Sequence, residues 1–557
     1  MSKGLDEKTA PDAAVPPASG PTIRRWVFWP AAAIAVVFIA FTMLAPGLAD
    51  AAFGAVQTFI VSTFNWYYIL IAAFFVVFAL TMGFSRFGSI RLGRDDDEPE
   101  FSTLSWFSLL FAAGMGIGLV FYGVSEPLSH FVSPRPGVEG TPAQLAQSAM
   151  SQTFLHWGVH AWAIYVVIGL ALAYAFHRRG RPRTIRWALE PVLGAKRVTG
   201  GWGNAIDVVA LVGTVFGVAT SLGLGVLQIS AGLDSVASIP ATALTQAVIV
   251  AIITAFVLLS VLSGVGRGMK WLSNTNLVLA GVFVLVLLFA GPTEFLLRDL
   301  VQSLGNYIQS FVGLSFTVSA YSGDDGVAWQ GAWTTFYWGW WMSWAPFVGI
   351  FIARISRGRT VREFVVGVIL VPTLVAVVWF TVLGGTAIWM QLSGAADLAP
   401  GGEVDVETAL FQVLANLPAS GVLTVGVLII IGIFFVTSAD SGALVMSMIA
   451  TGGEENPKRW VRIFFTLATS AIALALLFAG GLQALQTAAI SIALPFSLVM
   501  LAICWATVVA FRREIRAYDR ARREQLRDQI GEHYGLEVDE PNQRGVFDLV
   551  TRPWRRG

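Results

Sequence analysis

Aromatic side chains gather in two apolar stretches of this chain, one centred near residue 164 and one near residue 342. Spacings of three and four residues put several of these side chains on one face of a helix. Indole and phenol faces attract a quaternary ammonium through cation–π contacts worth about 0.5–2 kcal/mol each. Such a cation donates no N–H bond, so aromatic walls suit it better than carboxylates. The pattern favours an ammonium-binding cluster over core packing, with candidates Trp157, Trp162, Tyr165, Trp340, Trp341 and Trp344.

Glycines alternate in a second stretch, at Gly114, Gly116 and Gly118, with Met115 and Ile117 between them. Each glycine costs roughly 1 kcal/mol in a helix interior. The run permits unwinding, which frees carbonyls and turns the N-terminus of a half-helix toward a carboxylate. The alternative is close packing of helices through small residues.

Hydroxyl side chains form a third group. Thr437 and Ser438 are adjacent in an apolar stretch and offer the hard oxygen ligands that Na⁺ takes, unless they bond back to the preceding turn. Asp440 beside them marks an ion path or a buried pair. Glycines also surround a second set of hydroxyls, which form another cation site or a packing surface: Thr214, Thr220 and Ser221.

His156 and His160 lie four residues apart and have the spacing of metal ligands. No third ligand is near them in the sequence, so a hydrogen-bonded pair is the preferred interpretation. No nucleophile–base pair is visible either, which disfavours an enzyme embedded in the membrane.

The composition limits the class of protein. Of 557 residues, 55% are hydrophobic and only 13% are charged, whereas soluble chains carry about 25% charged residues. This excludes a water-soluble enzyme, a nucleic-acid binder and a disordered scaffold. A net charge of +1 attracts no acidic partner, and the single Cys504 forms no disulfide framework.

Stretches of roughly 20 apolar residues predict helices that span a bilayer, because a helix satisfies its own backbone there. Basic residues concentrate in alternate loops, most densely at 178–197, and place both termini in the cytoplasm. The twelve predicted spans are 27–47, 60–83, 103–124, 153–176, 206–231, 240–263, 272–290, 332–353, 364–390, 420–449, 460–480 and 483–511.

The spans divide into two leading helices and two blocks of five, as an inverted repeat requires. Residues 293–320 are too polar to span and predict an amphipathic helix at the outer surface. Charges after 511 predict a cytoplasmic helix, either a solvated flank or a regulatory arm that senses anionic lipid or ionic strength. The predicted units are a tail over 1–25, leading spans and loop over 26–101, a first repeat over 102–290, an amphipathic segment over 291–331, a second repeat over 332–511, and a partly helical tail over 512–557.

Four runs resemble the betaine/carnitine/choline transporter family, in particular its sodium-coupled glycine betaine symporters from actinobacteria. The similarity extends from about 30 to 515. It implies an all-α membrane protein with a LeuT-like inverted-repeat core, a homotrimer in the bacterial cytoplasmic membrane, and a substrate box at mid-depth. The runs are FAAGMGIGLVFYGVSEPL (111–128), FLHWGVHAWAIY (154–165), FYWGWWMSWAPFVGIFIARISRGRTVREF (336–364) and FFVTSADS (434–441).

The resemblance also implies roles for single residues. The six aromatic candidates would hold the ammonium, and the glycine run from 114 to 118 would face the substrate carboxylate. Gly118 favours a zwitterion, because family members that carry choline tend to have an acid there. The first Na⁺ site would consist of Ala112, Met115, Phe434, Thr437 and Ser438.

A second Na⁺ site would use Thr214 and Phe347. Val218 stands where the family has a hydroxyl, so this site lacks one oxygen ligand unless Thr220, Ser221 or water supplies it. The family's sodium-independent antiporters have fixed positive groups near the ion sites, whereas Lys and Arg are absent from 111–124, 206–231 and 430–447.

The expected function is therefore Na⁺-coupled symport, with one or two ions, of glycine betaine or a similar compatible solute by alternating access. The expected partners are the zwitterionic substrate and the bilayer, with anionic lipid at the C-terminal tail and no nucleic acid. The alternatives are a proton-coupled or sodium-independent exchange transporter of carnitine, choline or ectoine, and an osmosensor or channel in which the box only binds ligand.

Overall fold

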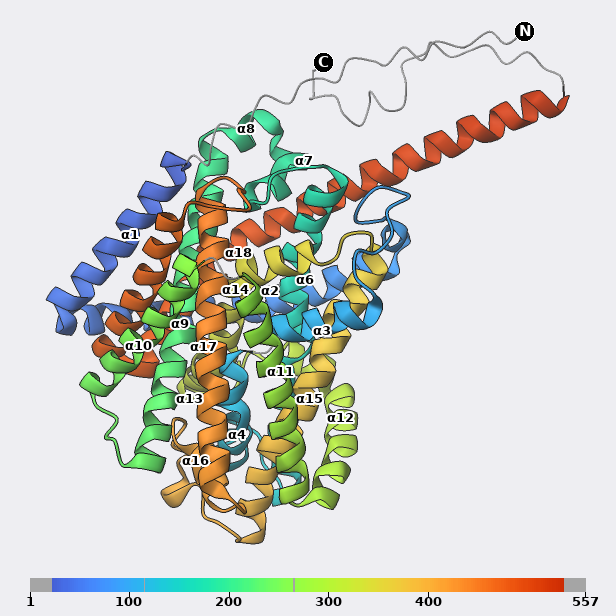
Figure 1. Cartoon of the computed structure of the whole chain (residues 1–557). Helices are drawn as coiled ribbons and strands as arrows, with labels where there is room; N and C mark the ends of the chain where they lie inside the picture. Colours follow the sequence, from blue (N-terminus) through green and yellow to red (C-terminus); the bar gives the residue numbers. More distant parts are fainter. Residues whose placement is uncertain (1–22, 115, 264–265, 535–557) are drawn as a thin grey trace.

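The computed structural model describes residues 23–114, 116–263 and 266–534, which form a bundle of α-helices (Figure 1). One isolated β-bridge joins Arg91 to Thr360. The predicted all-α class is confirmed. The helices are α1 (Arg25–Leu44), α2 (Pro46–Phe84), α3 (Thr103–Gly114), α4 (Ile117–Val132), α5 (Pro142–Trp157), α6 (Val159–Ala173), α7 (Glu190–Leu193), α8 (Ala195–Thr199), α9 (Gly201–Ala237), α10 (Ala243–Ser263), α11 (Gly266–Ala290), α12 (Thr293–Ser315), α13 (Gly323–Gln330), α14 (Phe336–Arg354), α15 (Val361–Ser393), α16 (Ala409–Ala415), α17 (Ser420–Ala450) and α18 (Arg459–Tyr534).

Nine helical segments in the described ranges are long and apolar enough to cross a bilayer. One of them extends over 72 residues of α18, although its backbone leaves the helical conformation at Gly480 and Gly481. The predicted span at 103–124 is a broken pair, α3 and α4, and the span at 332–353 coincides with α14. The count of twelve crossings and the inverted repeat stay predictions.

The semi-polar segment predicted over 293–320 forms the helix α12, which packs against α5 and α15. Leu296, Ser303 and Tyr307 make up its buried side, while Val301 and Ile308 are exposed. The segment is thus helical and two-sided, as its pattern predicts. Its position at a membrane surface stays a prediction.

Two helices are interrupted near the middle of the bundle. Helix α3 ends at Gly114, Gly116 is extended (φ −146°, ψ 179°), and α4 begins at Ile117. The glycine run is therefore unwound, as the first of its two interpretations predicts; Met115 lies outside the described residues. The second break is Gly158 (φ −97°, ψ −130°), which separates α5 from α6.

Helices α6 and α14 approach closely because each presents a glycine to the other. A Cβ added to Gly349 would lie 2.4 Å from Ile168, and one added to Gly169 would lie 2.6 Å from Ile352. Without a hydrophobic driving force in lipid, such contacts let van der Waals packing hold helices together. This packing fixes the distance between the two aromatic stretches.

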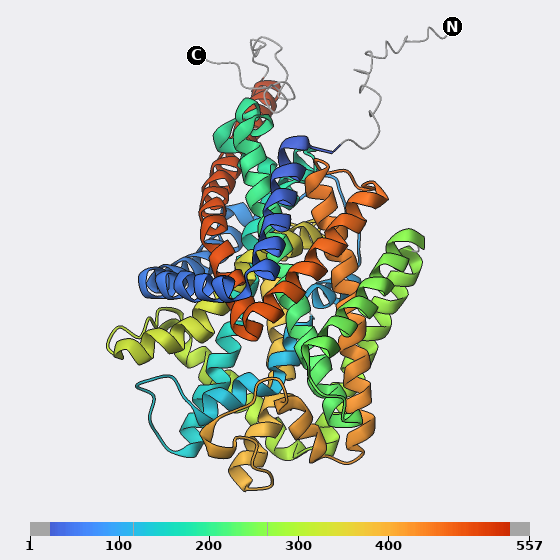
Figure 2. The ribbon, with the colours of Figure 1, turned by 90° about the vertical axis from the view of Figure 1, so that its left-hand side faces the viewer.

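One end of the bundle, which we call the basic end, carries α7, α8, the start of α1 and the loop between α17 and α18 (Figures 1 and 2). The stretch 178–197, which is rich in arginine, contains α7 and leads into α8, so it belongs to this end. The last part of α18 projects away from this end as a single straight helix (Figure 1). We call this part, residues 512–534, the α18 extension.

Arg178 anchors the base of the α18 extension. Its guanidinium donates to Glu514 Oε1 from Nε (2.9 Å) and to Asp95 Oδ1 from Nη1 (2.7 Å). Tyr518 also donates to Asp95. Partial burial would raise the pKa of Asp95, but the hydrogen bonds from Arg178 and Tyr518 hold it below its usual value, so the carboxylate stays charged at neutral pH. The base of the extension is thus fixed to the loop after α2.

Replacing Arg178 by Gln should release the α18 extension. A hydrogen bond to a charged group contributes about 1.5–3 kcal/mol. We therefore expect amide hydrogen exchange over 512–530 to accelerate by about tenfold or more in Arg178→Gln. The matched control is Arg527→Gln, because Arg527 makes only an exposed 3.8 Å pair with Asp528. Equal exchange in the two variants would show that Arg178 does not anchor the helix.

Candidate functional site

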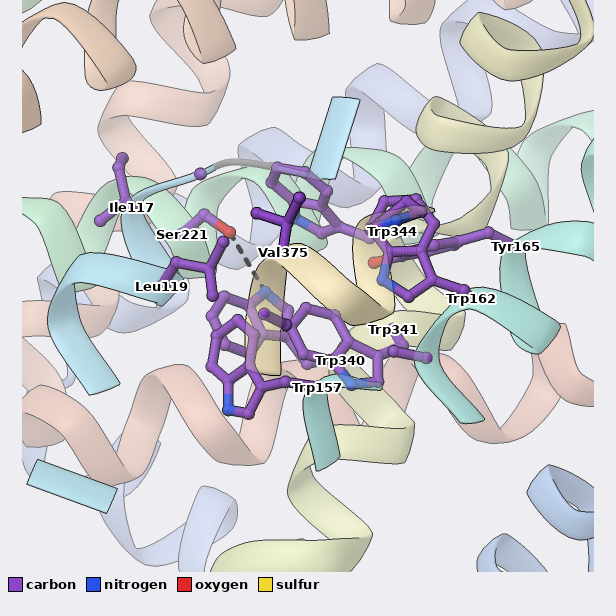
Figure 3. A pocket seen from close by; sticks show the side chains of 15 residues that line it. Ile117, Leu119, Trp157, Trp162, Tyr165, Ser221, Trp340, Trp341, Trp344 and Val375 are labelled. Atoms are coloured by element: carbon purple, nitrogen blue, oxygen red, sulfur yellow. Dashed lines mark hydrogen bonds between the residues drawn. The ribbon is translucent and has the colours of Figure 1, made fainter. Parts of the chain in front are cut away.

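A cavity of about 50 Å³ lies in the middle of the bundle, between α4, α5, α6, α9, α14 and α15 (Figure 3). We call it the central cavity. Gly116, Ile117 and Gly118 line it from the first helix break, and Ser221 lines it from α9. Gly114 is the last residue of α3. All six aromatic candidates from the sequence also line the cavity: Trp157, Trp162, Tyr165, Trp340, Trp341 and Trp344.

Hydrogen bonds fix the orientation of the indole rings. A buried indole N–H needs an acceptor, since leaving it unpaired is costly. Four of the rings have a protein acceptor on another helix, and Figure 3 shows the bond from Trp340 to Ser221, which itself lines the cavity. The bonds are Trp157 Nε1 to Glu126 Oε2 (2.6 Å), Trp340 Nε1 to Ser221 Oγ (3.1 Å), Trp341 Nε1 to the His156 carbonyl (2.8 Å) and Trp344 Nε1 to the Gly217 carbonyl (2.6 Å).

The rings enclose the cavity from different directions. Trp340 and Trp341 stack at 4.7 Å with an interplanar angle of 15°. Trp157 stands nearly at right angles to Trp341, at 4.9 Å and 70°. Trp162 and Tyr165 meet edge to face at 5.4 Å on the side of α6. This arrangement offers aromatic faces to a methylated cation from several sides.

Gly118 is required by the closeness of these rings. A Cβ at this position would lie 2.4 Å from Cη2 of Trp340 and 2.9 Å from Cη2 of Trp157. At Gly116 an added Cβ meets no atom within 4 Å. The two glycines therefore differ in role: Gly118 lets two rings approach the backbone, and Gly116 belongs to the helix break.

Glu126 is a buried acid beside the central cavity that the motif analysis missed. Its carboxylate is fully buried and accepts hydrogen bonds from Trp157 and Tyr337. His156 Nδ1 lies 2.6 Å from Glu126 Oε1, and His130 Nε2 lies 3.4 Å from the same oxygen. A lone acid in an apolar span is a functional-site signal. That rule, applied to the run 111–128, would have found it.

The expected hydrogen-bonded role of His156 is confirmed by its contacts with Glu126 and, through Nε2, with Thr334 at 3.0 Å. His160 turns elsewhere and stacks on Trp338 at 5.2 Å, and neither of its ring nitrogens has a hydrogen-bond partner among the described residues, so the expected hydrogen-bonded role is wrong for this histidine. The ligand atoms that do come together, within 4.8 Å of one another, belong to Glu126, His130 and His156.

A second cavity, of about 100 Å³, lies between α11, α14 and α17, and we call it the inner cavity. Phe434, Thr437 and Ser438 of the first predicted Na⁺ site line it. The Thr437 hydroxyl donates to the carbonyls of Ile433 (2.9 Å) and Phe434 (3.1 Å), which is the bond back to the preceding turn that the sequence offered as the alternative to an ion site. Of the other predicted ligands, Ala112 is in the last turn of α3 and Met115 lies outside the described residues.

The residues of the second predicted Na⁺ site do not both line the inner cavity. Phe347 lines the inner cavity, while the Thr214 hydroxyl donates to the Ala210 carbonyl at 2.8 Å. Val218 packs α9 against α17, since a Cβ at Gly442 would lie 3.2 Å from its methyl groups. The hydroxyls proposed as substitutes are already donors: Thr220 bonds to Leu485 O (3.2 Å) and Ser221 to Gly217 O (3.3 Å).

Asp440 forms a buried pair, one of the two roles predicted for it. Its Oδ1 lies 2.9 Å from Nη2 of Arg462 on α18. The stretch 430–447 contains no basic residue, but the fold brings one from the next helix. The pair neutralises both charges near Ser438.

Apolar helices around a central cavity, with two of them broken beside it, are the architecture of a membrane transporter. The chain belongs to the betaine/carnitine/choline transporter family, whose model matches residues 26–516. This is a family of transporters, and the resemblance inferred from the four sequence runs is confirmed.

Several relatives align over most of their length. An uncharacterized transporter of Mycobacterium tuberculosis is 49% identical over 90% of this chain and 84% of its own. A glycine betaine transporter of Bacillus subtilis is 44% identical over 88% and 95%, respectively. An ectoine/hydroxyectoine transporter of Virgibacillus pantothenticus is 39% identical over 86% and 95%.

Replacing Glu126 tests whether it supports the rings. Glu126→Leu leaves the donors of Trp157 and Tyr337 unpaired, at about 1–3 kcal/mol each, whereas Glu126→Gln keeps an acceptor. We expect the thermal unfolding temperature to fall in the order wild type, Gln, Leu, with the intrinsic fluorescence altered in Leu. The exposed Glu139→Gln is the control. A Leu variant that melts like the wild type would contradict this role.

Proposed function

We propose that the protein is a Na⁺-coupled symporter of glycine betaine or a similar compatible solute. The observation that carries the proposal is the central cavity, with six aromatic side chains around it. A quaternary ammonium fits such walls because it needs no hydrogen-bond acceptor. The relatives named for glycine betaine and for ectoine support a compatible solute as the substrate.

The carboxylate of the substrate would lie at the helix break. Helix α4 begins at Ile117, and the N-terminus of a 16-residue helix carries a partial positive charge and free N–H groups. Gly116, Ile117 and Gly118 line the central cavity at this point. The zwitterion would thus bind with its ammonium among the rings and its carboxylate toward α4.

Na⁺ would bind at Phe434, Thr437 and Ser438, with carbonyls from Ala112 and Met115, and a second ion at Thr214 and Phe347. One inward Na⁺ supplies about 2.3 kcal/mol per 100 mV, and about 1.4 kcal/mol for a tenfold gradient. Together these support roughly 500-fold accumulation of a neutral substrate, and two ions would support about 10⁵-fold. Because Val218 removes one oxygen ligand from the second Na⁺ site, coupling to one ion is better supported than coupling to two.

Transport would proceed by alternating access between the two sides of the membrane. In this proposal the basic end faces the cytoplasm, since cytoplasmic loops retain Lys and Arg. The twelve-span protein would form a homotrimer in the bacterial cytoplasmic membrane, with the α18 extension near anionic lipid.

Proton coupling is a second candidate, favoured by the cluster of Glu126, His130 and His156 beside Trp157. In that case ectoine, carnitine or choline transport would follow pH and not Na⁺. Uptake of labelled glycine betaine into proteoliposomes, with Na⁺, pH and membrane potential varied separately, distinguishes the two. Uptake that does not saturate and never exceeds equilibrium would instead indicate a channel.

Replacing Trp341 by Ala should abolish uptake, because its ring lines the central cavity and packs against Trp157 and Trp340. We expect less than a tenth of wild-type uptake, with the protein still folded by thermal unfolding. The matched control is Trp505→Ala, since Trp505 is 61% exposed on the bundle surface. Wild-type kinetics in Trp341→Ala would refute the aromatic cavity as the substrate site.

Replacing Gly118 by Ala should weaken binding, because the added Cβ must displace Trp340 or Trp157. Overpacking costs about 1–3 kcal/mol, so we expect the Kd for glycine betaine, from tryptophan fluorescence, to rise about tenfold. Gly116→Ala is the control, since a Cβ there meets no atom within 4 Å. An equal effect of both substitutions would show that the contact with the rings is not the cause.

A further inference from the structure

Asn276 of α11 is a buried amide without a partner. Its side chain is 1% exposed, and both Nδ2 and Oδ1 lack a hydrogen bond to any described residue. Buried amides in native proteins are almost always paired, with protein, water or an ion. The position of Asn276 thus calls for a partner that is not part of the chain.

The surroundings of Asn276 indicate what that partner is. It lines the inner cavity together with hydroxyls of Thr437, Ser438 and Ser441 on α17 and of Ser273 on α11. The cavity is polar on this side and has room for a hydrated ion. Its lining contains oxygen ligands and no carboxylate. Neutral oxygens suit a monovalent cation, whereas Ca²⁺ and Mg²⁺ are held by carboxylates.

The inner cavity lies on the side of the central cavity toward the basic end, because α14, which lines both, ends there: the Ala353 carbonyl lies 2.9 Å from Nε2 of His177, next to Arg178. Trp344 lines both cavities, and its bond to Gly217 holds the ring between them. From Trp344 the lining extends along α14 to Phe351, close to Arg354 at the end of the helix. An ion that leaves the Thr437 and Ser438 hydroxyls in this direction passes Asn276.

We propose that Asn276 Oδ1 is a cation ligand, which with Ser273 and Ser441 forms a transit site for Na⁺ between the first Na⁺ site and the basic end. This inference rests on the proposed function and deepens it. Because its ligands are neutral and water completes its coordination, the transit site holds Na⁺ weakly and releases it. Asp440 does not compete for the ion, since its carboxylate is paired with Arg462.

The test compares three substitutions in proteoliposomes. Asn276→Leu removes the oxygen at similar size, Asn276→Asp keeps an oxygen and adds charge, and Asn274→Leu is the control at an exposed position of the same helix. The Na⁺ concentration for half-maximal glycine betaine uptake is measured at saturating substrate. The Kd for glycine betaine is measured at saturating Na⁺, and ²²Na⁺ binding without substrate.

We expect Asn276→Leu to raise the half-maximal Na⁺ concentration about tenfold, with the Kd for glycine betaine changed less than twofold. Asn276→Asp should bind ²²Na⁺ at least threefold more tightly than the wild type, and Asn274→Leu should match the wild type. A purely structural role would instead lower the unfolding temperature and impair both variants at Asn276 alike.

Wild-type Na⁺ dependence in Asn276→Leu would overturn the transit site while leaving the symporter intact. If Asn276→Leu does not fold, Asn276→Asp decides, and unchanged or weaker ²²Na⁺ binding overturns the proposal. If substrate uptake by the wild type does not depend on Na⁺, the proposed symport is refuted, and the transit site with it.

Discussion

The structure depends on satisfying indole N–H groups inside an apolar bundle. A quaternary ammonium at the ring faces accepts no hydrogen bond, so the indole N–H groups need acceptors from the protein. These acceptors lie on other helices. Trp344 uses a carbonyl of α9, Trp341 uses a carbonyl of α5, and Trp157 uses the carboxylate of Glu126 on α4. Each ring is thereby a tie between two helices as well as a wall of the cavity.

Glycine at chosen points makes this arrangement possible. Gly118 allows the start of α4 to lie against two indole rings, and the Gly169–Gly349 contact brings α6 to α14. The break at Gly158 follows directly after Trp157, so the last residue of α5 is the one whose ring lines the cavity. The shape of the cavity therefore depends on the same glycines that let the helices approach. Larger residues at these glycine positions would push apart the helices that line the cavity.

The sequence predicted those cavity residues that follow one another at regular spacing along a single helix. The period of three and four found Trp162, Tyr165, Trp341 and Trp344, and the alternating glycines located the break at Gly116. Contacts between distant segments were not predictable in this way. Glu126 meets His156 across 30 residues, and Arg462 meets Asp440 across 22. Asn276 lines one cavity with Thr437 and Ser438 because α11 packs on α17. The periodicity of a sequence describes one helix at a time, so it contains no information about contacts between residues on different segments.

The α18 extension has a mechanical consequence. Beyond Gly481 the helix contains Pro495, and from Pro495 to Tyr534 one helix joins the part packed among the other helices to the outer arm. At 1.5 Å per residue, the arm over 512–534 is roughly 35 Å long. A tilt of about 10° at its base would displace its tip by roughly 6 Å. A small rotation inside the bundle is thus converted into a large movement outside it, as in a lever.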